Sequence, residues 1–278
     1  MSGHTPGPWM AGEPAWYRGR SDPSAGKRSI TAATDGVVAN VYGEANARLI
    51  AAAPAPPAAL QDVDLRATQA RIAAGIGKKK DRTAFLLGEL ARIGVDTFIR
   101  VGSTGALHAH MQLGDLVIST GAVRLDGASK DLVMPEYPAV AHYEVVMALI
   151  QAAEELKVRY HVGITASTDT FYTGQGRPAL GGYLPSFKEH ILEDMQKAGV
   201  LNFEMEVSAL LTAANIFGKR AGAVCVVIAN RVTDEFQITD AMEKNAGAVA
   251  SLAVTILAKW DKEKEKKGKK FLYPDILT

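Results

Sequence analysis

Apolar residues recur at two alternating periods along most of the chain, from about residue 83 to residue 260. Stretches with apolar residues three or four apart, which predict amphipathic helices, alternate with short continuous apolar runs, which predict buried strands. The expected helices are 83–93, 140–156, 186–198, 205–217 and 240–260, and the expected strands are 97–101, 116–119, 160–166 and 221–228. Strands that alternate with helices predict an α/β fold whose sheet is covered on both faces. Ligands of such sheets usually lie at the carboxyl ends of the strands.

The first 60 residues have a different texture, because prolines and glycines are frequent and the candidate strands, 29–33 and 36–41, are short. Residues 51–59 are all alanine or proline, and proline blocks helix continuation and favours extended backbone, so we expect a linker there that reaches about residue 70. The predicted organisation is an atypical N-terminal segment over 1–60, a main domain over 71–260 and a charged C-terminal tail over 261–278.

The 278 residues carry a formal net charge of +1, and 47% of them are apolar and 22% charged. A nearly neutral chain lacks the electrostatic footprint of a nucleic-acid or membrane-surface protein, so neither partner is expected. No apolar run reaches the ~18 residues of a membrane span, and the N-terminus lacks the features of a secretory signal, so we expect a cytoplasmic protein. The single cysteine, Cys225, lies in an apolar run, where a buried and unreactive thiol is expected.

Residues 171–177, Phe-Tyr-Thr-Gly-Gln-Gly-Arg, carry the most informative candidate chemistry. The two glycines permit a tight turn or a close approach of a ligand. Gln175 offers an amide donor and acceptor, and Arg177 offers a fixed fork of donors. This pair suits a planar ring that carries carbonyl groups and an N–H, such as the edge of uracil, and Phe171 adds a flat apolar face. A simple polar turn is the alternative interpretation.

A second motif follows the strand predicted at 97–101. Arg100 stands at the strand end, and Ser103 and Thr104 lie in the glycine-flanked turn expected at 102–105. A charged fork together with hydroxyl and backbone donors is what an oxyanion such as phosphate needs. A tight turn beside a salt-bridged arginine is the alternative.

Two further motifs lie at the ends of predicted elements. Glu204 and Glu206 precede a helix, and because residues two apart cannot share a helix face, one of them is expected before the first turn. A carboxylate there is either a partner of the helix dipole or a ligand for the paired hydroxyls of a ribose. Asn230 and Arg231 close the strand 221–228 at its carboxyl end, where a binding residue or a surface arginine is expected.

Other sequence patterns do not complete a known site. His108 and His110 have no third and fourth ligand nearby, so no metal is expected. Residues 75–79, Gly-Ile-Gly-Lys-Lys, fail the nucleotide phosphate-loop pattern, because Lys79 stands where a hydroxyl residue is required and Ile72 where the first glycine is required. The chain also lacks a Ser-His-Asp arrangement with a nucleophile elbow.

Five segments taken together resemble the uridine-cleaving members of the nucleoside phosphorylase-I family, namely 99–106, 123–129, 171–177, 202–206 and 228–231. They follow the family's order and spacing and cover about residues 83–258. The resemblance implies a three-layer α/β/α fold with a central mixed sheet and a homo-oligomer, a hexamer or dimer. It further implies reversible phosphorolysis of uridine to uracil and ribose 1-phosphate, with inorganic phosphate as co-substrate and without a redox or organic cofactor.

The resemblance also implies a role for each residue of the site. Uracil is expected to contact Phe171, Gln175, Arg177 and Arg231, ribose to contact Thr104, Met205 and Glu206, and phosphate to contact Arg100 and Ser103. The implied catalytic residues are Arg100, Arg177 and Arg231, because positioning and charge stabilisation carry most of such a reaction. Purine-cleaving relatives have an acidic residue where Asn230-Arg231 stands, so the sequence favours a pyrimidine.

The N-terminal third departs from the family. The family's Gly-Asp-Pro-x-Arg-like phosphate loop and its subunit-bridging arginine have no counterpart, and only residues 75–77 match the expected early Gly-Ile-Gly turn. Arg48 and His4 are candidates for the missing positive charge by residue type alone, and residues 4–9 with 45–50 are similar to short phage-type proteins. Two alternatives therefore stay open: a non-catalytic nucleoside-binding relative with an incomplete phosphate site, and a phosphate-independent nucleosidase.

Overall fold

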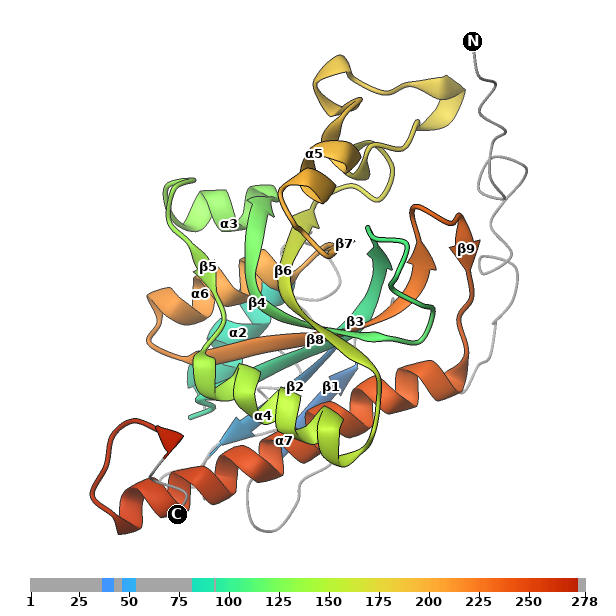
Figure 1. The fold of residues 1–278 in the computed structure, drawn as a ribbon. Coiled ribbons are helices and arrows are strands. Elements are labelled where there is room, and N and C mark those ends of the chain that lie inside the picture. Colours follow the sequence, from blue (N-terminus) through green and yellow to red (C-terminus); the bar gives the residue numbers. More distant parts are fainter. Residues whose placement is uncertain (1–36, 43–46, 54–81, 93, 275–278) are drawn as a thin grey trace, which may run out of the picture.

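The structure is a computed structural model that describes residues 37–42, 47–53, 82–92 and 94–274 (Figure 1). The sequence predictions that lie outside the described residues are His4, the strand 29–33, the linker residues 54–59 and the segment 75–79. The described residues form one sheet with helices packed on both of its faces.

The sheet is mixed and has nine strands. These are β1 Val37–Tyr42, β2 Ala47–Ala53, β3 Thr97–Ala106, β4 Leu116–Leu125, β5 Ala139–Val140, β6 Tyr160–Thr168, β7 Asn202–Glu204, β8 Arg220–Asn230 and β9 Glu235–Phe236. Their order is β1-β2-β3-β7-β6-β4-β8-β9, with β5 beside β4. Because β3 also pairs in parallel with β8, strands β3, β7, β6, β4 and β8 close into a ring. The β1–β2 hairpin adds to β3, with Arg48 paired to Val101.

Helices cover both faces of this sheet, as Figure 1 shows. They are α2 Arg82–Arg92, α3 Gly127–Leu132, α4 Tyr143–Glu155, α5 Ile191–Lys197, α6 Val207–Ile216 and α7 Asp240–Lys266. Side chains alternate across a strand, so Ile99 of β3 packs against α4 and α7, whereas the neighbouring Phe98 packs against α2 and α6. The predicted α/β/α architecture with a mixed central sheet is confirmed.

Most predicted elements are confirmed with shifted ends. The helices predicted at 83–93, 140–156, 205–217 and 240–260 correspond to α2, α4, α6 and α7, and the strands predicted at 97–101, 116–119, 160–166 and 221–228 correspond to β3, β4, β6 and β8. Gly94 ends α2 with a φ of 92°, which favours glycine. The candidate strand 36–41 corresponds to β1.

Three predictions of local structure are wrong. The turn expected at 102–105 is a continuation of β3, because each of its residues pairs with β8. The helix expected at 186–198 divides into the 3₁₀ turn Ser186–Lys188 and α5. The linker expected from residue 51 begins in β2, which extends to Ala53. The first residues of the charged tail, up to Lys266, form the end of α7.

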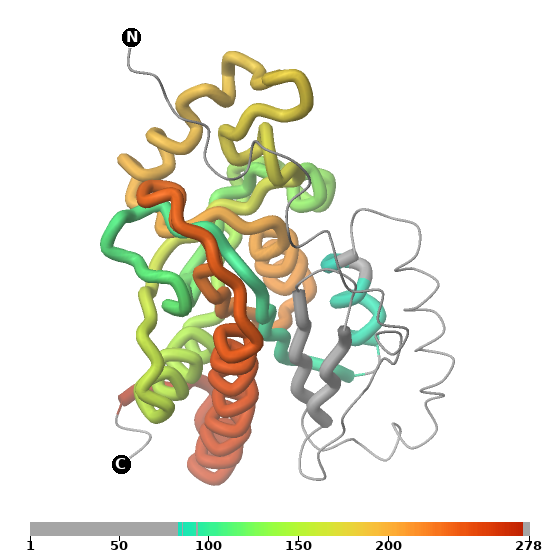
Figure 2. Tube along the Cα trace, turned by 90° about the vertical axis from the view of Figure 1, so that its right-hand side faces the viewer, coloured from blue at the N-terminus to red at the C-terminus, as the bar shows by residue number. Residues whose placement is uncertain are grey.

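The C-terminal half of the long helix α7 and the segment 171–198 lie at opposite ends of the molecule. Figures 1 and 2 both place residues 171–198 at one end, with the C-terminal half of α7 at the other.

Within the described part of the chain, none of the helices has the length and apolar character needed to cross a membrane. The carboxyl ends of β6, β7 and β8 approach the 171–198 end, and this is where the predicted site residues lie.

Candidate functional site

Arg100 lies within β3, where it is buried and held by groups from two other elements. Its Nη1 donates to Cys225 Sγ at 3.0 Å, and its Nη2 forms an ion pair with Glu206 and lies 3.4 Å from Glu204 Oε2. Gly102 provides room for the guanidinium, since a Cβ there would lie 2.7 Å from Arg100 Cζ. Burial alone would lower the pKa of Arg100, but the carboxylates of Glu206 and Glu204 raise it, so the group is charged.

The two carboxylates before α6 have different environments. Glu204 is 3% exposed, and it accepts hydrogen bonds from the N–H of Glu206 at 2.8 Å, from the N–H of Val207 at 3.0 Å and from the Ser167 hydroxyl. It therefore caps α6, while Glu206, the N-cap residue, makes no capping bond with its side chain. The Glu206 side chain pairs with Arg100 and stays 35% exposed, so it remains accessible to a ligand.

Thr104, expected to contact a ribose, is engaged with β7. Its hydroxyl donates to Phe203 O at 2.6 Å and accepts from Asn202 Nδ2, also at 2.6 Å. The residue is 4% exposed, so the side chain fixes β3 against β7 and approaches a ligand only over a small area. Ser103 and Met205, by contrast, are partly exposed.

The 171–177 loop forms a short 3₁₀ turn, Thr173–Gln175, followed by Gly176 with a left-handed φ of 70°. Gln175 is 4% exposed, and the Arg177 guanidinium stacks on the Phe171 ring, with Cζ 4.5 Å from the ring centroid. Arg177 Nη1 lies 3.4 Å from Gln175 Oε1. The predicted turn is present, and it holds an amide, a guanidinium and an aromatic ring together.

Arg231 follows β8 and reaches the same loop. Its Nη2 donates to Gln175 O at 3.2 Å, and its side chain passes over Gly105, where a Cβ would lie 3.7 Å from Arg231 Cδ. Burial, together with the positive charge of Arg177, lowers the pKa of Arg231 to about 9, and burial lowers the pKa of Arg177 to about 10. Arg231 Nη1 is buried without a hydrogen-bond partner among the described residues. Two guanidinium groups held this way favour a ligand with negative charge or several acceptor oxygens.

The predicted residues thus fall into two clusters. We call Arg100, Glu204 and Glu206 the carboxylate cluster, and Phe171, Gln175, Arg177 and Arg231 the loop cluster. Strand β3 connects them, because it carries both Arg100 and the glycine beneath Arg231. Asn230 belongs to neither cluster, since its amide donates to the carbonyl oxygens of His108 at 3.0 Å and Met111 at 2.7 Å and so holds a loop.

A buried network around Asp126 was not identified from the sequence. Asp126 is 1% exposed, accepts from Ser129 N at 2.6 Å and Ser129 Oγ at 2.8 Å, and accepts from the Ser208 hydroxyl of α6. Arg124 donates to Met134 O at 2.7 Å in the same region. The Asp126–Ser129 spacing, typical of a helix N-cap, was the available signal. The network fixes the start of α6, and with it the position of the carboxylate cluster.

The histidines at 108 and 110 lie close together, with ring centroids 5.6 Å apart. His108 Nε2 is 2.9 Å from the Val200 carbonyl oxygen, so one of its ring nitrogens has a backbone partner. In the described ranges, no group of three or more His, Cys, Asp or Glu residues is arranged to hold a metal ion.

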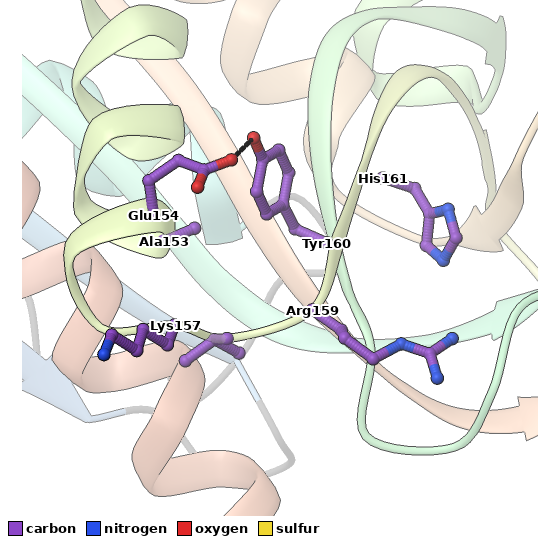
Figure 3. Close-up of a pocket in the computed structure, with 7 residues that line it drawn as sticks. Ala153, Glu154, Lys157, Arg159, Tyr160 and His161 are labelled. Carbon is purple, nitrogen blue, oxygen red and sulfur yellow. Dashed lines mark hydrogen bonds between the residues drawn. The ribbon is translucent and has the colours of Figure 1, made fainter.

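A separate hollow lies at the other end of β6 from the loop cluster. It has a volume of about 380 Å³ and is lined by Ala153, Glu154, Lys157, Val158, Arg159, Tyr160 and His161. Figure 3 shows Lys157 and Arg159 directed apart, while the Tyr160 hydroxyl donates to Glu154 at 2.5 Å. None of the predicted site residues lines this hollow, and its charged side chains do not converge on a common point.

Comparison with known proteins gives two family matches. The phosphorylase superfamily matches residues 68–258, and the family of Salmonella phage P22 protein Y8K6 matches residues 1–85. The uridine phosphorylase of Thermococcus kodakarensis is 60% identical over 194 residues, which are 70% of this chain and 69% of that protein. The uridine phosphorylases of Klebsiella aerogenes and Escherichia coli are 41% and 40% identical, each over 62% of this chain and 68% of the relative.

Proposed function

Because the chain belongs to the phosphorylase superfamily, we propose that it catalyses the phosphorolysis of uridine to uracil and ribose 1-phosphate. The observation that carries this proposal is the loop cluster, in which Gln175, Arg177 and Arg231 converge and Arg231 Nη1 is buried with no hydrogen-bond partner in the described part of the chain. The Gln175 amide can both donate to a carbonyl oxygen and accept from the N–H of a uracil ring, and the guanidinium groups can donate to the ring's carbonyl oxygens. The similar enzymes are named uridine phosphorylases, which agrees with a nucleoside and phosphate as the two substrates.

On the phosphate side, Arg100 is the proposed ligand, together with the hydroxyl of Ser103. Arg100 is charged and fixed by Cys225 and the carboxylates, so its orientation is set before phosphate arrives. Such preorganisation is the largest contribution that a protein makes to a reaction without covalent catalysis. A phosphate oxygen then forms a bond to the anomeric carbon as the bond from that carbon to the uracil nitrogen breaks.

On the ribose side, Glu206 is proposed to accept hydrogen bonds from the sugar hydroxyls, with Met205 and Thr104 lining the sugar. The sugar becomes positively charged and oxocarbenium-like as the base departs, and a nearby carboxylate stabilises that charge. Glu206 has the required exposure, 35%, and Glu204 fixes its backbone N–H.

On the base side, the electron pair of the broken bond moves into the uracil ring. Arg177 and Arg231 are proposed to stabilise that negative charge, and Phe171 to pack against the ring. The lowered pKa values of both arginines, about 10 and about 9, reflect burial of positive charge that an anionic base would offset. The proposed reaction uses inorganic phosphate as co-substrate and needs no redox or organic cofactor.

We extend the proposal to a homo-oligomer that works in the cytoplasm, where nucleosides and phosphate are both available. Large apolar side chains that are strongly exposed near the loop cluster support an assembly, among them Leu180 at 98% and Phe187 at 78% exposed. Exposed apolar surface of this kind is typical of subunit contacts.

The test is release of uracil from uridine, measured by absorbance, with and without inorganic phosphate. We expect release that requires phosphate, and we expect inosine to be a much poorer substrate than uridine. Release at the same rate without phosphate would indicate a nucleosidase, and uridine binding without any release would indicate a non-catalytic relative. Either result, obtained with folded protein, would overturn the proposed function.

A further inference from the structure

Glu204 is a buried carboxylate that the proposed reaction does not use, although it touches both substrate sides of the site. It lies at the end of β7 and is 3% exposed. Oε2 accepts from Glu206 N at 2.8 Å and lies 3.4 Å from Arg100 Nη2, and Oε1 accepts from the Ser167 hydroxyl and from Val207 N at 3.1 Å. The Glu204 side chain therefore contacts both Arg100, the proposed phosphate ligand, and the backbone of Glu206, the proposed ribose ligand.

We propose that Glu204 is a positioning residue that couples phosphate binding to ribose binding, an inference that rests on the proposed phosphorolysis. The shared oxygen is Oε2, which holds the Glu206 backbone in place and balances the Arg100 charge at the same time. Arg100 Nη2 also pairs with the Glu206 side chain, so the three residues form a closed set of contacts. Any movement of the Glu204 carboxylate therefore displaces Arg100 and Glu206 together.

The contacts suit a carboxylate and not an amide. Burial and the charge of Glu206 raise the pKa of Glu204, whereas Arg100, the Ser167 hydroxyl and the Glu206 N–H favour its charged form. All the groups that face the two oxygens are donors, namely two backbone N–H groups, one hydroxyl and one guanidinium. A carboxylate accepts from all of them, whereas a glutamine must direct an N–H₂ group toward at least one donor. If the amide nitrogen takes the place of Oε2, its hydrogens face the donors of Arg100 and Glu206. If it takes the place of Oε1, they face the Ser167 hydroxyl and the Val207 N–H.

Capping of α6 alone would be a purely structural role, and it makes a different prediction. A lost cap lowers the melting temperature and the fraction of active protein without changing the Michaelis constants. A lost positioning residue raises the Michaelis constants for phosphate and for uridine, because Arg100 and Glu206 are both misplaced. Contact with Arg100 is what separates the two roles.

The experiment compares Glu204→Gln with Glu144→Gln in the full chain. Glu144 is an equally buried carboxylate, 2% exposed, that pairs with Lys264 at 2.7 Å and Arg220 at 3.1 Å at the opposite end of β8 from Arg231. We expect both variants to melt at a lower temperature. Only Glu204→Gln should raise the Michaelis constants for phosphate and uridine, each by about tenfold, the size expected when one charged hydrogen-bonding partner is lost. Constants within twofold of wild type in folded Glu204→Gln would overturn the proposal.

A milder pair of variants covers the case in which Glu204→Gln does not fold. Ser167→Ala removes one donor to Glu204, and Thr97→Ala removes a buried hydroxyl at the start of β3 that accepts from Arg220 Nε at 2.9 Å. Ser167→Ala should raise both Michaelis constants by about threefold, and Thr97→Ala should leave them unchanged. Equal constants for the two variants would overturn the proposal.

A binding readout separates this inference from the proposed function. Inorganic phosphate alone should raise the melting temperature of wild type, and a higher phosphate concentration should be needed for the same rise in Ser167→Ala. If wild type shows that rise but releases no uracil, the proposed function fails while the role of Glu204 stands. If wild type neither binds phosphate nor releases uracil, both fail.

Discussion

Replacement of Gly102 by alanine tests whether the orientation of Arg100 limits the reaction. A Cβ on Gly102 would lie 2.7 Å from Arg100 Cζ and 2.8 Å from Nη2, whereas ordinary contact begins at 3.4 Å. Cζ must therefore retreat by about 0.7 Å, the difference between 3.4 and 2.7, and Nη1, which lies closer still to the added Cβ, must retreat further. A misplacement near 1 Å costs up to about a hundredfold in rate. We expect Gly102→Ala to lower kcat/KM for phosphate by about tenfold to a hundredfold.

Gly88→Ala is the matched control, because it adds the same methyl group at a position with no neighbouring atom of the described residues within 4 Å of the added Cβ. Gly88 is in the interior of α2, where alanine favours the helix by about 0.5–1 kcal/mol over glycine, so this variant should melt slightly higher and keep full activity. The assay is the initial rate of uracil release as phosphate is varied, with the melting temperature measured for each variant. A folded Gly102→Ala with wild-type kcat/KM for phosphate would refute the role given to Arg100.

Three further predictions concern buried charged or reactive groups. Arg231→Gln should slow uracil release by about a hundredfold or more without lowering the melting temperature. Burial and the charge of Arg177 lower the pKa of Arg231 to about 9, so below that pH the folded protein carries a buried charge that is less favourable than in the unfolded chain; a marked loss of melting temperature would contradict this. Burial would raise the pKa of Glu144, but Lys264 and Arg220 lower it, so its stabilisation should be present above about pH 4.5, its usual value, and disappear as pH falls further. Glu144→Gln should therefore cost about 3 kcal/mol of unfolding free energy at pH 7 and less in acid, as measured by denaturant titration. Burial raises the pKa of Cys225 to about 12, so iodoacetamide should modify it at pH 8 only after unfolding.

The periodicity of the sequence predicted the alternating helices and strands well because each long element buries one face or both. The prediction of a turn at 102–105 was wrong for a specific reason. Glycines usually signal turns, but in a strand they also mark a close approach, and here Gly102 makes room for the Arg100 guanidinium. Sequence alone could not distinguish a turn from a strand glycine that accommodates an arginine.

The contacts among the candidate site residues could not be predicted from the sequence. Spacing indicated that Glu204 and Glu206 could not share a helix face, but which of them caps α6 depends on where β7 ends. That strand has only three residues and no sequence signal of its own. The contact between Arg231 and the Gln175 carbonyl joins residues 56 positions apart, and it follows from the closure of the sheet through the β3–β8 pairing. Local patterns do not encode such a closure.

Transfer of the ribose to phosphate, and not to water, can be observed by ³¹P NMR of a reaction that contains the full chain, uridine and inorganic phosphate. We expect the phosphate signal to fall as a ribose 1-phosphate signal grows, in equal amount to the uracil released. Release of uracil with an unchanged phosphate signal, or no release by folded protein, would contradict it.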